Sequence, residues 1–196
     1  MAEALEQAGI ESFPVATEAA DRRTYLARPD LGRRLDGASR DALRERSGTW
    51  GRRDLLVLVS DGLSALAAER QAVPVLARLF PLLQGAGWTL YPVLIVPFGR
   101  VKLQDEAGEL LGARQSVMLL GERPGFSSID SLGAYLTFGP GAARTDADRN
   151  CLSNIRPEGL PPAQAAAKLA ALLAASAERK VSGVALKDLE EPSLEG

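Results

Sequence analysis

Residues 54–96 read DLLVLVSDGLSALAAERQAVPVLARLFPLLQGAGWTLYPVLIV, and their pattern establishes the fold class. They begin with an apolar run at 54–60 and end with another at 89–96, and such runs are typical of strands buried on both faces of a parallel sheet. Between them, residues 63–84 place apolar side chains at spacings of three and four, which predicts a helix interrupted at Pro74 and Pro81. Together these residues predict a β-α-β unit.

The same alternation continues on both sides of this unit. On the N-terminal side, SRDALRERS predicts a short helix that begins with Ser39 as its N-cap and ends at Gly48 and Gly51. On the C-terminal side we expect a helix at 105–111, strands at 117–120 and 133–138, and a long helix at 161–180. Strands separated by helices favour parallel pairing, so we predict an α/β fold with a Rossmann-like, mostly parallel sheet flanked by helices.

The pattern also suggests how the chain is divided. Residues 1–38 contain a possible short helix at 2–8 and an arginine-rich stretch broken by Pro29 and Gly32, and we expect them to form a partly irregular N-terminal arm. Residues 39–188 carry the predicted α/β domain. Residues 189–196, LEEPSLEG, have the composition of a flexible tail.

Composition excludes several classes of function. The chain has no histidine, so a Ser-His-Asp triad, a Cys-His dyad and a histidine metal site cannot form within it. Its single cysteine excludes an internal disulfide and fits a reducing compartment. A net charge of −2 and scattered basic residues argue against nucleic acid as a partner.

The expected location of the protein follows from its N-terminus and its apolar stretches. The N-terminal residues show no secretory signal, and no apolar stretch approaches the roughly 20 residues of a membrane helix. We therefore expect a cytoplasmic protein with no membrane contact.

Three polar segments stand where loops should follow strands: VSDGLSAL at 59–66, GERPGFSSIDSLGAY at 121–135 and ARTDADRNCLSNIRP at 143–157. Ligands of parallel sheets bind at the carboxyl ends of the strands, so these segments are the candidate site. In the first segment, Asp61 and Ser64 suit either a ligand-binding turn or a plain helix cap. In the second, Glu122 either accepts hydrogen bonds from amides or pairs with Arg123 to hold the loop. In the third, Cys151 is a small packing residue rather than a nucleophile, because no histidine activates it.

The two standard phosphate-binding loops, GxGxxG after a strand and GxxxxGK[ST], are absent from the sequence. This argues against ordinary dinucleotide-binding and nucleotide-hydrolysing proteins. A free-standing module that binds a nucleotide or regulates a partner, and a purely structural interaction protein, remain as alternatives.

Over residues 23–188 the chain resembles the ethanolamine ammonia-lyase small subunit family. The similarity rests on VSDGLSALA, on the run from GRVKLQDEAGELLG to GERPGFSSIDSLGAYLTF, on RTDADRNCLSNIRPEGL and on SGVALKD, in that order. The resemblance implies an adenosylcobalamin-dependent lyase that converts ethanolamine to acetaldehyde and ammonia by radical chemistry. It further implies a large TIM-barrel subunit as partner in a hetero-oligomer, and a small subunit that completes the cobalamin site without being active alone.

By position in these motifs, the resemblance implies that Val101 in GRVKL, Glu122 in GERPG and Cys151 in RNCLSN contact the cobalamin. It implies no catalytic residue and no metal ligand in this chain, and a cofactor that stays base-on. The family is associated with bacterial microcompartments through a longer N-terminal region, whereas only residues 1–22 precede the similar RTYLARPDLGRRL stretch here.

Overall fold

The computed structural model describes residues 1–125 and 128–188, and its centre is a six-stranded sheet. Its strands are β1 (Ser12–Pro14), β2 (Leu55–Ser60), β3 (Val93–Ile95), β4 (Gln115–Gly121), β5 (Leu132–Phe138) and β6 (Arg149–Ile155). The spatial order is β1-β3-β2-β4-β5-β6, and the first four strands in that order run parallel. The predicted α/β class and the mostly parallel sheet are confirmed.

Two features of the sheet differ from expectation. β5 runs antiparallel to β4, and β6 runs antiparallel to β5. The prediction of parallel pairing came from the β-α-β pattern, but residues 122–125 and 128–131, the described part of the β4–β5 connection, contain no helix, and the chain leads back along β4. β6 falls within a segment expected to be a polar loop; three of its seven residues are exposed at the edge of the sheet, which explains its polar sequence.

β2 is an inner strand of the sheet, and its side chains belong to apolar clusters on both faces of the sheet. All six of its residues are buried, and successive side chains point to opposite faces. Leu55, Val57 and Val59 join the apolar cluster on one face, whereas Leu56 and Leu58 join the cluster on the other. A strand that buries both faces must be covered by helices on both sides.

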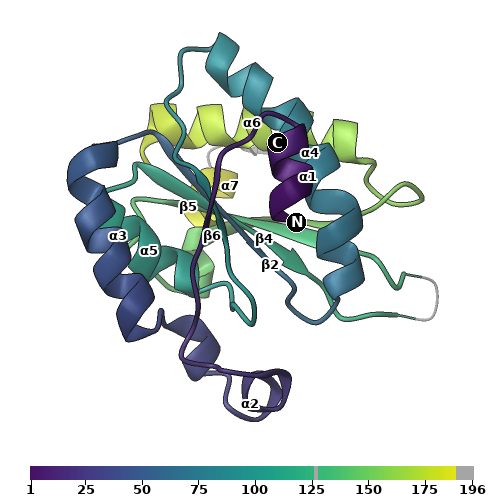
Figure 1. Cartoon of the computed structure of the whole chain (residues 1–196). Coiled ribbons are helices and arrows are strands. Elements are labelled where there is room, and N and C mark those ends of the chain that lie inside the picture. The colour runs from purple at the N-terminus through teal and green to yellow at the C-terminus, as the bar shows by residue number, and fades with distance from the viewer. Residues whose placement is uncertain (126–127, 189–196) are drawn as a thin grey trace.

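Helices supply that cover. α4 (Ala65–Gly85) and α6 (Pro162–Arg179) pack on one face, and α3 (Gly37–Trp50) and α5 (Leu103–Leu111) pack on the other (Figure 1). The shorter elements are α1 (Ala2–Gln7), α2 (Arg22–Ala27), α7 (Val184–Asp188) and the 3-10 turns η1 (Leu31–Arg33) and η2 (Asp146–Asp148). Among the described helices none is long and apolar enough to cross a membrane.

The predicted interruption of α4 was wrong. The helix continues through both Pro74 and Pro81. Both prolines are exposed, so the carbonyls that lose a backbone partner face water, while Leu76, Leu79 and Phe80 hold the opposite side in the core. Burial of the apolar face outweighs the local cost of the prolines.

The start of α3 also differs from prediction. Asp36, not Ser39, is the N-cap, and its Oδ1 accepts the Ser39 N–H at 2.7 Å. The Ser39 hydroxyl instead accepts the backbone N–H of Ala16 at 2.8 Å, which ties the N-terminal segment to α3. The helix runs through Gly48 and ends at Gly51, where φ is +65°.

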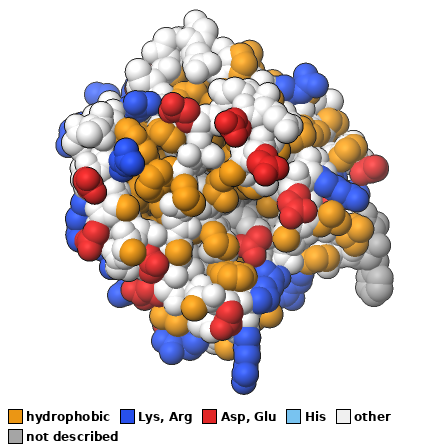
Figure 2. Space-filling view, in the orientation of Figure 1, with side chains coloured by type: hydrophobic (Ala, Val, Ile, Leu, Met, Phe, Trp, Pro, Cys, Tyr) orange, Lys and Arg blue, Asp and Glu red, His pale blue; other side chains and the backbone are white. Residues whose placement is uncertain are grey.

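The N-terminal residues take part in the sheet. β1 pairs in parallel with β3, and α2 and η1 follow it at one end of the molecule (Figure 1). Acidic and basic side chains are interspersed on the face that Figure 2 shows, with basic ones gathered at its lower end, where α2 lies. The division at residue 38 stays a prediction, and the predicted tail, 189–196, lies outside the described residues.

Candidate functional site: a pocket on the half-covered face of β5 and β6

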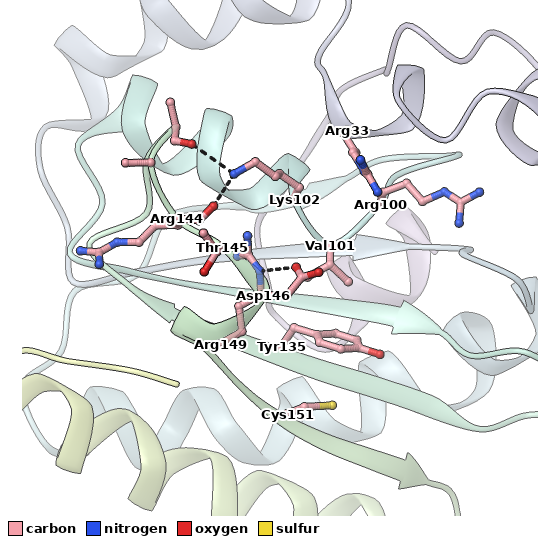
Figure 3. A pocket seen from close by; sticks show the side chains of 12 residues that line it. Arg33, Arg100, Val101, Lys102, Tyr135, Arg144, Thr145, Asp146, Arg149 and Cys151 are labelled. Atoms are coloured by element: carbon pink, nitrogen blue, oxygen red, sulfur yellow. Dashed lines mark hydrogen bonds and ion pairs between the residues drawn. The ribbon is translucent and has the colours of Figure 1, made fainter. Parts of the chain in front are cut away.

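A cavity of about 800 Å³ lies on β5 and β6. α6 covers one face of these strands through Leu132, Ala134 and Leu136. The opposite face carries Tyr135 and Cys151, which are register partners in β5 and β6, and it is roofed by chain segments at 100–102 and 142–146 instead of a helix (Figure 3). The pocket exists because α5 does not extend over this edge of the sheet.

The first roof segment, residues 100–102, is the end of a loop at 96–102 that follows β3, and this loop is held by the end of β2. The Phe98 N–H donates to Asp61 Oδ1 at 2.7 Å, and the Gly99 N–H donates to Ser60 Oγ at 2.9 Å. Phe98 adopts φ +59°, a conformation that costs about 1 kcal/mol or more for a residue with a side chain. These bonds compensate for that cost and direct the next residues, Arg100, Val101 and Lys102, to the pocket.

Lys102 joins the two roof segments. Its Nζ donates to the carbonyl oxygens of Ala142 (3.2 Å) and Arg144, and it lies 3.2 Å from Asp105 Oδ2 (Figure 3). The second segment is stiffened at its far end, where the Thr145 N–H and hydroxyl donate to Asp148 Oδ2 at 2.7 and 2.9 Å. These bonds fix the shape of the pocket wall within the chain itself.

A buried ion pair lies beneath this wall. Arg149 and Asp105 side chains are 3% and 2% exposed, and the guanidinium donates to both carboxylate oxygens, at 2.9 and 2.6 Å. It also donates to Thr137 Oγ1 at 2.8 Å. Burial alone would lower the pKa of Arg149, but the hydrogen bonds and charges of Asp105 and Asp146 raise it, so the guanidinium stays charged.

Tyr135 connects the pocket to Glu122. Burial raises the pKa of Tyr135, and the neighbouring Cys151 and Glu122 raise it further. Gly133 leaves space here, because a Cβ at that position would lie 2.9 Å from Glu122 Oε1 and 2.9 Å from the Tyr135 ring. Glu122 Oε2 accepts hydrogen bonds from the Ser131 hydroxyl and from the Asn154 N–H, the latter at 3.2 Å.

Two of the three predicted contact residues line one pocket, and the third lies beside it. Val101 and Cys151, fifty positions apart in the numbering, line the same pocket. Glu122 is not one of its lining residues but lies directly beyond Tyr135 on the same face of the sheet. Glu122 was also interpreted as a residue that holds its loop. The structure gives it a partner for that role other than Arg123, because Glu122 Oε2 accepts a hydrogen bond from the Ser131 hydroxyl.

Sequence reasoning missed most of the pocket's polar groups. Tyr135 and Arg144 lie within two of the candidate segments, but neither was singled out. Arg33, Arg100 and Lys102 lie outside all three segments. The GRVK stretch directly after an apolar strand was the available signal for Arg100 and Lys102. The cap interpretation of Ser64 is confirmed, since its Oγ accepts the Ala67 N–H at 3.2 Å.

Comparison with known proteins identifies the family. Residues 1–187 match the family described as "Ethanolamine ammonia-lyase light chain (EutC)". The chain belongs to the ethanolamine ammonia-lyase light-chain family. It is thus a small subunit of an ethanolamine ammonia-lyase, and the resemblance inferred from the motifs is confirmed.

Curated relatives agree over almost the whole chain. The "Ethanolamine ammonia-lyase small subunit" of Azotobacter vinelandii is 52% identical over 188 residues, which are 95% of this chain and 70% of that protein. The protein of the same name from Pseudomonas paraeruginosa is 53% identical over 194 residues, 98% of this chain and 71% of its own length. A small subunit of a lyase implies a large subunit as partner.

Proposed function

We propose that this small subunit completes an adenosylcobalamin site together with the large subunit, for the conversion of ethanolamine to acetaldehyde and ammonia. The supporting observation is that Val101 and Cys151, from segments far apart in the chain, line one preformed pocket with Glu122 beside it. In the reaction the cofactor supplies a radical by homolysis of its cobalt–carbon bond.

The residues at the pocket fit the periphery of a corrinoid, which carries many side-chain amides around an apolar ring. Val101, the Tyr135 ring and Cys151 offer apolar contact, and Glu122 offers carboxylate oxygens that accept amide N–H groups. Ligands that are fully enclosed by one protein fill pockets of up to about 1,000 Å³. A corrinoid is larger than such ligands, so a cavity of about 800 Å³ would cover only part of it and leave the rest to the large subunit.

The chain's own residues bind and orient rather than react. With no histidine in the sequence, the chain offers no imidazole ligand for cobalt, which supports a base-on cofactor. A tyrosine with its ordinary pKa near 10 is protonated at neutral pH, and burial raises the pKa of Tyr135 further, so its hydroxyl is a hydrogen-bond donor there and not a base. We therefore expect no deamination by this chain alone.

Reconstitution tests the proposal. The full chain is mixed with a large subunit, and ethanolamine deamination is measured with and without adenosylcobalamin. We expect activity only when both subunits and the cofactor are present. Deamination by the isolated chain, or full activity of the large subunit without it, would contradict the proposal.

The site itself is tested by substitutions at Glu122. Glu122→Ala should weaken cofactor binding to the complex by about tenfold, because a charged hydrogen-bond acceptor is lost, whereas Glu122→Gln should lose less because it keeps one acceptor. Glu178→Gln, at an exposed position on α6, is the matched control. Unchanged affinity in Glu122→Ala would favour a purely structural role for the subunit.

Assembly and location complete the proposal. We propose a hetero-oligomer of both subunits in the cytoplasm, with residence in a bacterial microcompartment as the second candidate location. Fractionation of cells grown on ethanolamine distinguishes the two locations.

A further inference from the structure

The pocket carries more positive charge than its neighbouring acids balance. Its basic lining residues are Arg33, Arg100, Lys102, Arg144 and Arg149. Asp105 lies within ion-pair distance of both Lys102 and Arg149, at 3.2 and 2.6 Å. Asp146 lies 3.4 Å from Arg149 Nε, and Asp148 lies 3.7 Å from Arg144 Nη1.

Arg33 and Arg100 are the two basic lining residues that none of these acids pairs with. Among the side chains described, those of residues 1–125 and 128–186, no carboxylate comes within ion-pair distance of either guanidinium. Arg33 is exposed on η1, and no hydrogen bond of its side chain is found among these residues. Two uncompensated charges beside one concave surface attract an anion, and planar guanidinium groups suit phosphate oxygens best.

The backbone is built to bring these two arginines together. The Arg100 N–H donates to the Gly32 carbonyl oxygen at 2.8 Å. A Cβ on Gly32 would lie 2.8 Å from the Phe98 carbonyl oxygen and 2.9 Å from Arg100 Cγ, so only glycine permits this approach. The approach places Arg33 next to the segment that carries Arg100 and Val101, as Figure 3 shows.

Arg100 is also held in place by Tyr25. Its guanidinium lies 4.1 Å from the centre of the Tyr25 ring, and Nη2 donates to the Tyr25 carbonyl oxygen at 2.8 Å. Its Nε is buried without a hydrogen-bond partner among the described residues. The chain thus keeps a partly buried cation at the pocket with no described carboxylate at ion-pair distance to offset its desolvation.

We infer that Arg33 and Arg100 form an anion subsite of the pocket, which takes a phosphodiester. The inference rests on the proposed function for the identity of the ligand: the phosphodiester is that of the nucleotide tail of cobalamin. Because Arg33 comes from η1 and Arg100 from the segment after β3, the subsite also gives the N-terminal residues a role in binding the cofactor.

The test compares two corrinoids on the complex of this chain with a large subunit. Cyanocobalamin carries the phosphodiester tail, and dicyanocobinamide lacks it; equilibrium dialysis measures both affinities. Arg33→Gln should weaken cyanocobalamin binding about tenfold and leave cobinamide binding unchanged. Arg34→Gln, at an exposed neighbour outside this pocket, is the control and should change neither affinity.

Charge and salt provide further readouts. Arg33→Lys should recover part of the affinity that Arg33→Gln loses, because it restores a positive charge. The affinity for cyanocobalamin should fall as ionic strength rises, and it should fall more steeply for the unsubstituted complex than for the complex with Arg33→Gln. Equal weakening of both corrinoids by Arg33→Gln, or behaviour like that of Arg34→Gln, would overturn the subsite.

A measurement on the full chain alone separates this inference from the proposed function. Inorganic phosphate should shift the backbone amide resonances of Gly32, Arg33 and Arg100, and Arg33→Gln should reduce these shifts. Phosphate shifts without cobalamin binding by the complex would retain the anion subsite and contradict the proposed function. Cobalamin binding that is insensitive to Arg33 and salt, together with absent phosphate shifts, would contradict only the subsite.

Discussion

The backbone N–H of Phe98 donates to Oδ1 of Asp61 across 2.7 Å, and this bond joins the end of β2 to the segment that carries Val101. Asp61 Oδ2 also lies 3.7 Å from Arg22 on α2, so one carboxylate contacts the pocket roof and the N-terminal residues. The VSDGLSAL motif therefore acts through position: it holds the parts of the site and does not line the pocket.

Asp61→Ala should lower the free energy of unfolding by about 1–3 kcal/mol, because it leaves the Phe98 N–H without its acceptor. It should also weaken cofactor binding, whereas Asp61→Asn should lose less because its amide oxygen can still accept. Urea unfolding and dialysis measure the two effects. Asp41→Ala, at a side chain that is 76% exposed, is the control. Equal behaviour of Asp61→Ala and Asp41→Ala would exclude the proposed role.

Asp105→Asn should destabilise the protein by about 3–5 kcal/mol, because it leaves the buried Arg149 without a counter-charge. Asp146→Asn is a matched control: Asp146 also pairs with Arg149, but its side chain is 99% exposed, so its loss should cost little. Chemical denaturation measures the free energy of unfolding of both variants. Similar losses in the two variants would contradict the importance of burial.

Gly62→Ala should be strongly destabilising, because φ is +53° and a Cβ would collide with the Gly121 carbonyl oxygen. Gly48→Ala should instead stabilise the protein by about 0.5–1 kcal/mol, since Gly48 lies inside α3 with open space around it. Thermal unfolding of the two variants should move in opposite directions. A tolerated Gly62→Ala would refute the close approach of the β2 and β4 ends.

The three tyrosines of the chain should all resist ionisation. Burial raises the pKa of Tyr25, Tyr91 and Tyr135 above the usual value near 10. Near pH 10 the ultraviolet absorbance should therefore show less tyrosinate than that of urea-unfolded protein. Because the unfolded chain releases these protons first, stability should fall as pH rises above about 10. Identical titrations of folded and unfolded protein would contradict this prediction.

The fold class and the main elements were readable from the order of the amino acids alone. Apolar runs at 54–60 and 117–120 predicted buried strands correctly, because burial on both faces leaves a continuous apolar run. The long helix near 161–180 was also readable, since its apolar side repeats with helical spacing. The absence of histidine excludes several chemistries whatever the fold, because composition does not depend on folding.

Tertiary contacts decided three further features of the fold. They set the direction of β5, they pair β1 with β3 and β6 with β5, and they keep α4 continuous through its prolines. These contacts join residues distant in the sequence, which local patterns do not record. The pocket belongs to the same group. Motifs singled out Val101, Glu122 and Cys151 one at a time, but the cavity exists because no helix in the described part of the chain covers the Tyr135 face of β5 and β6. The approach of Gly32 to Arg100 then places two unbalanced cations beside the cavity.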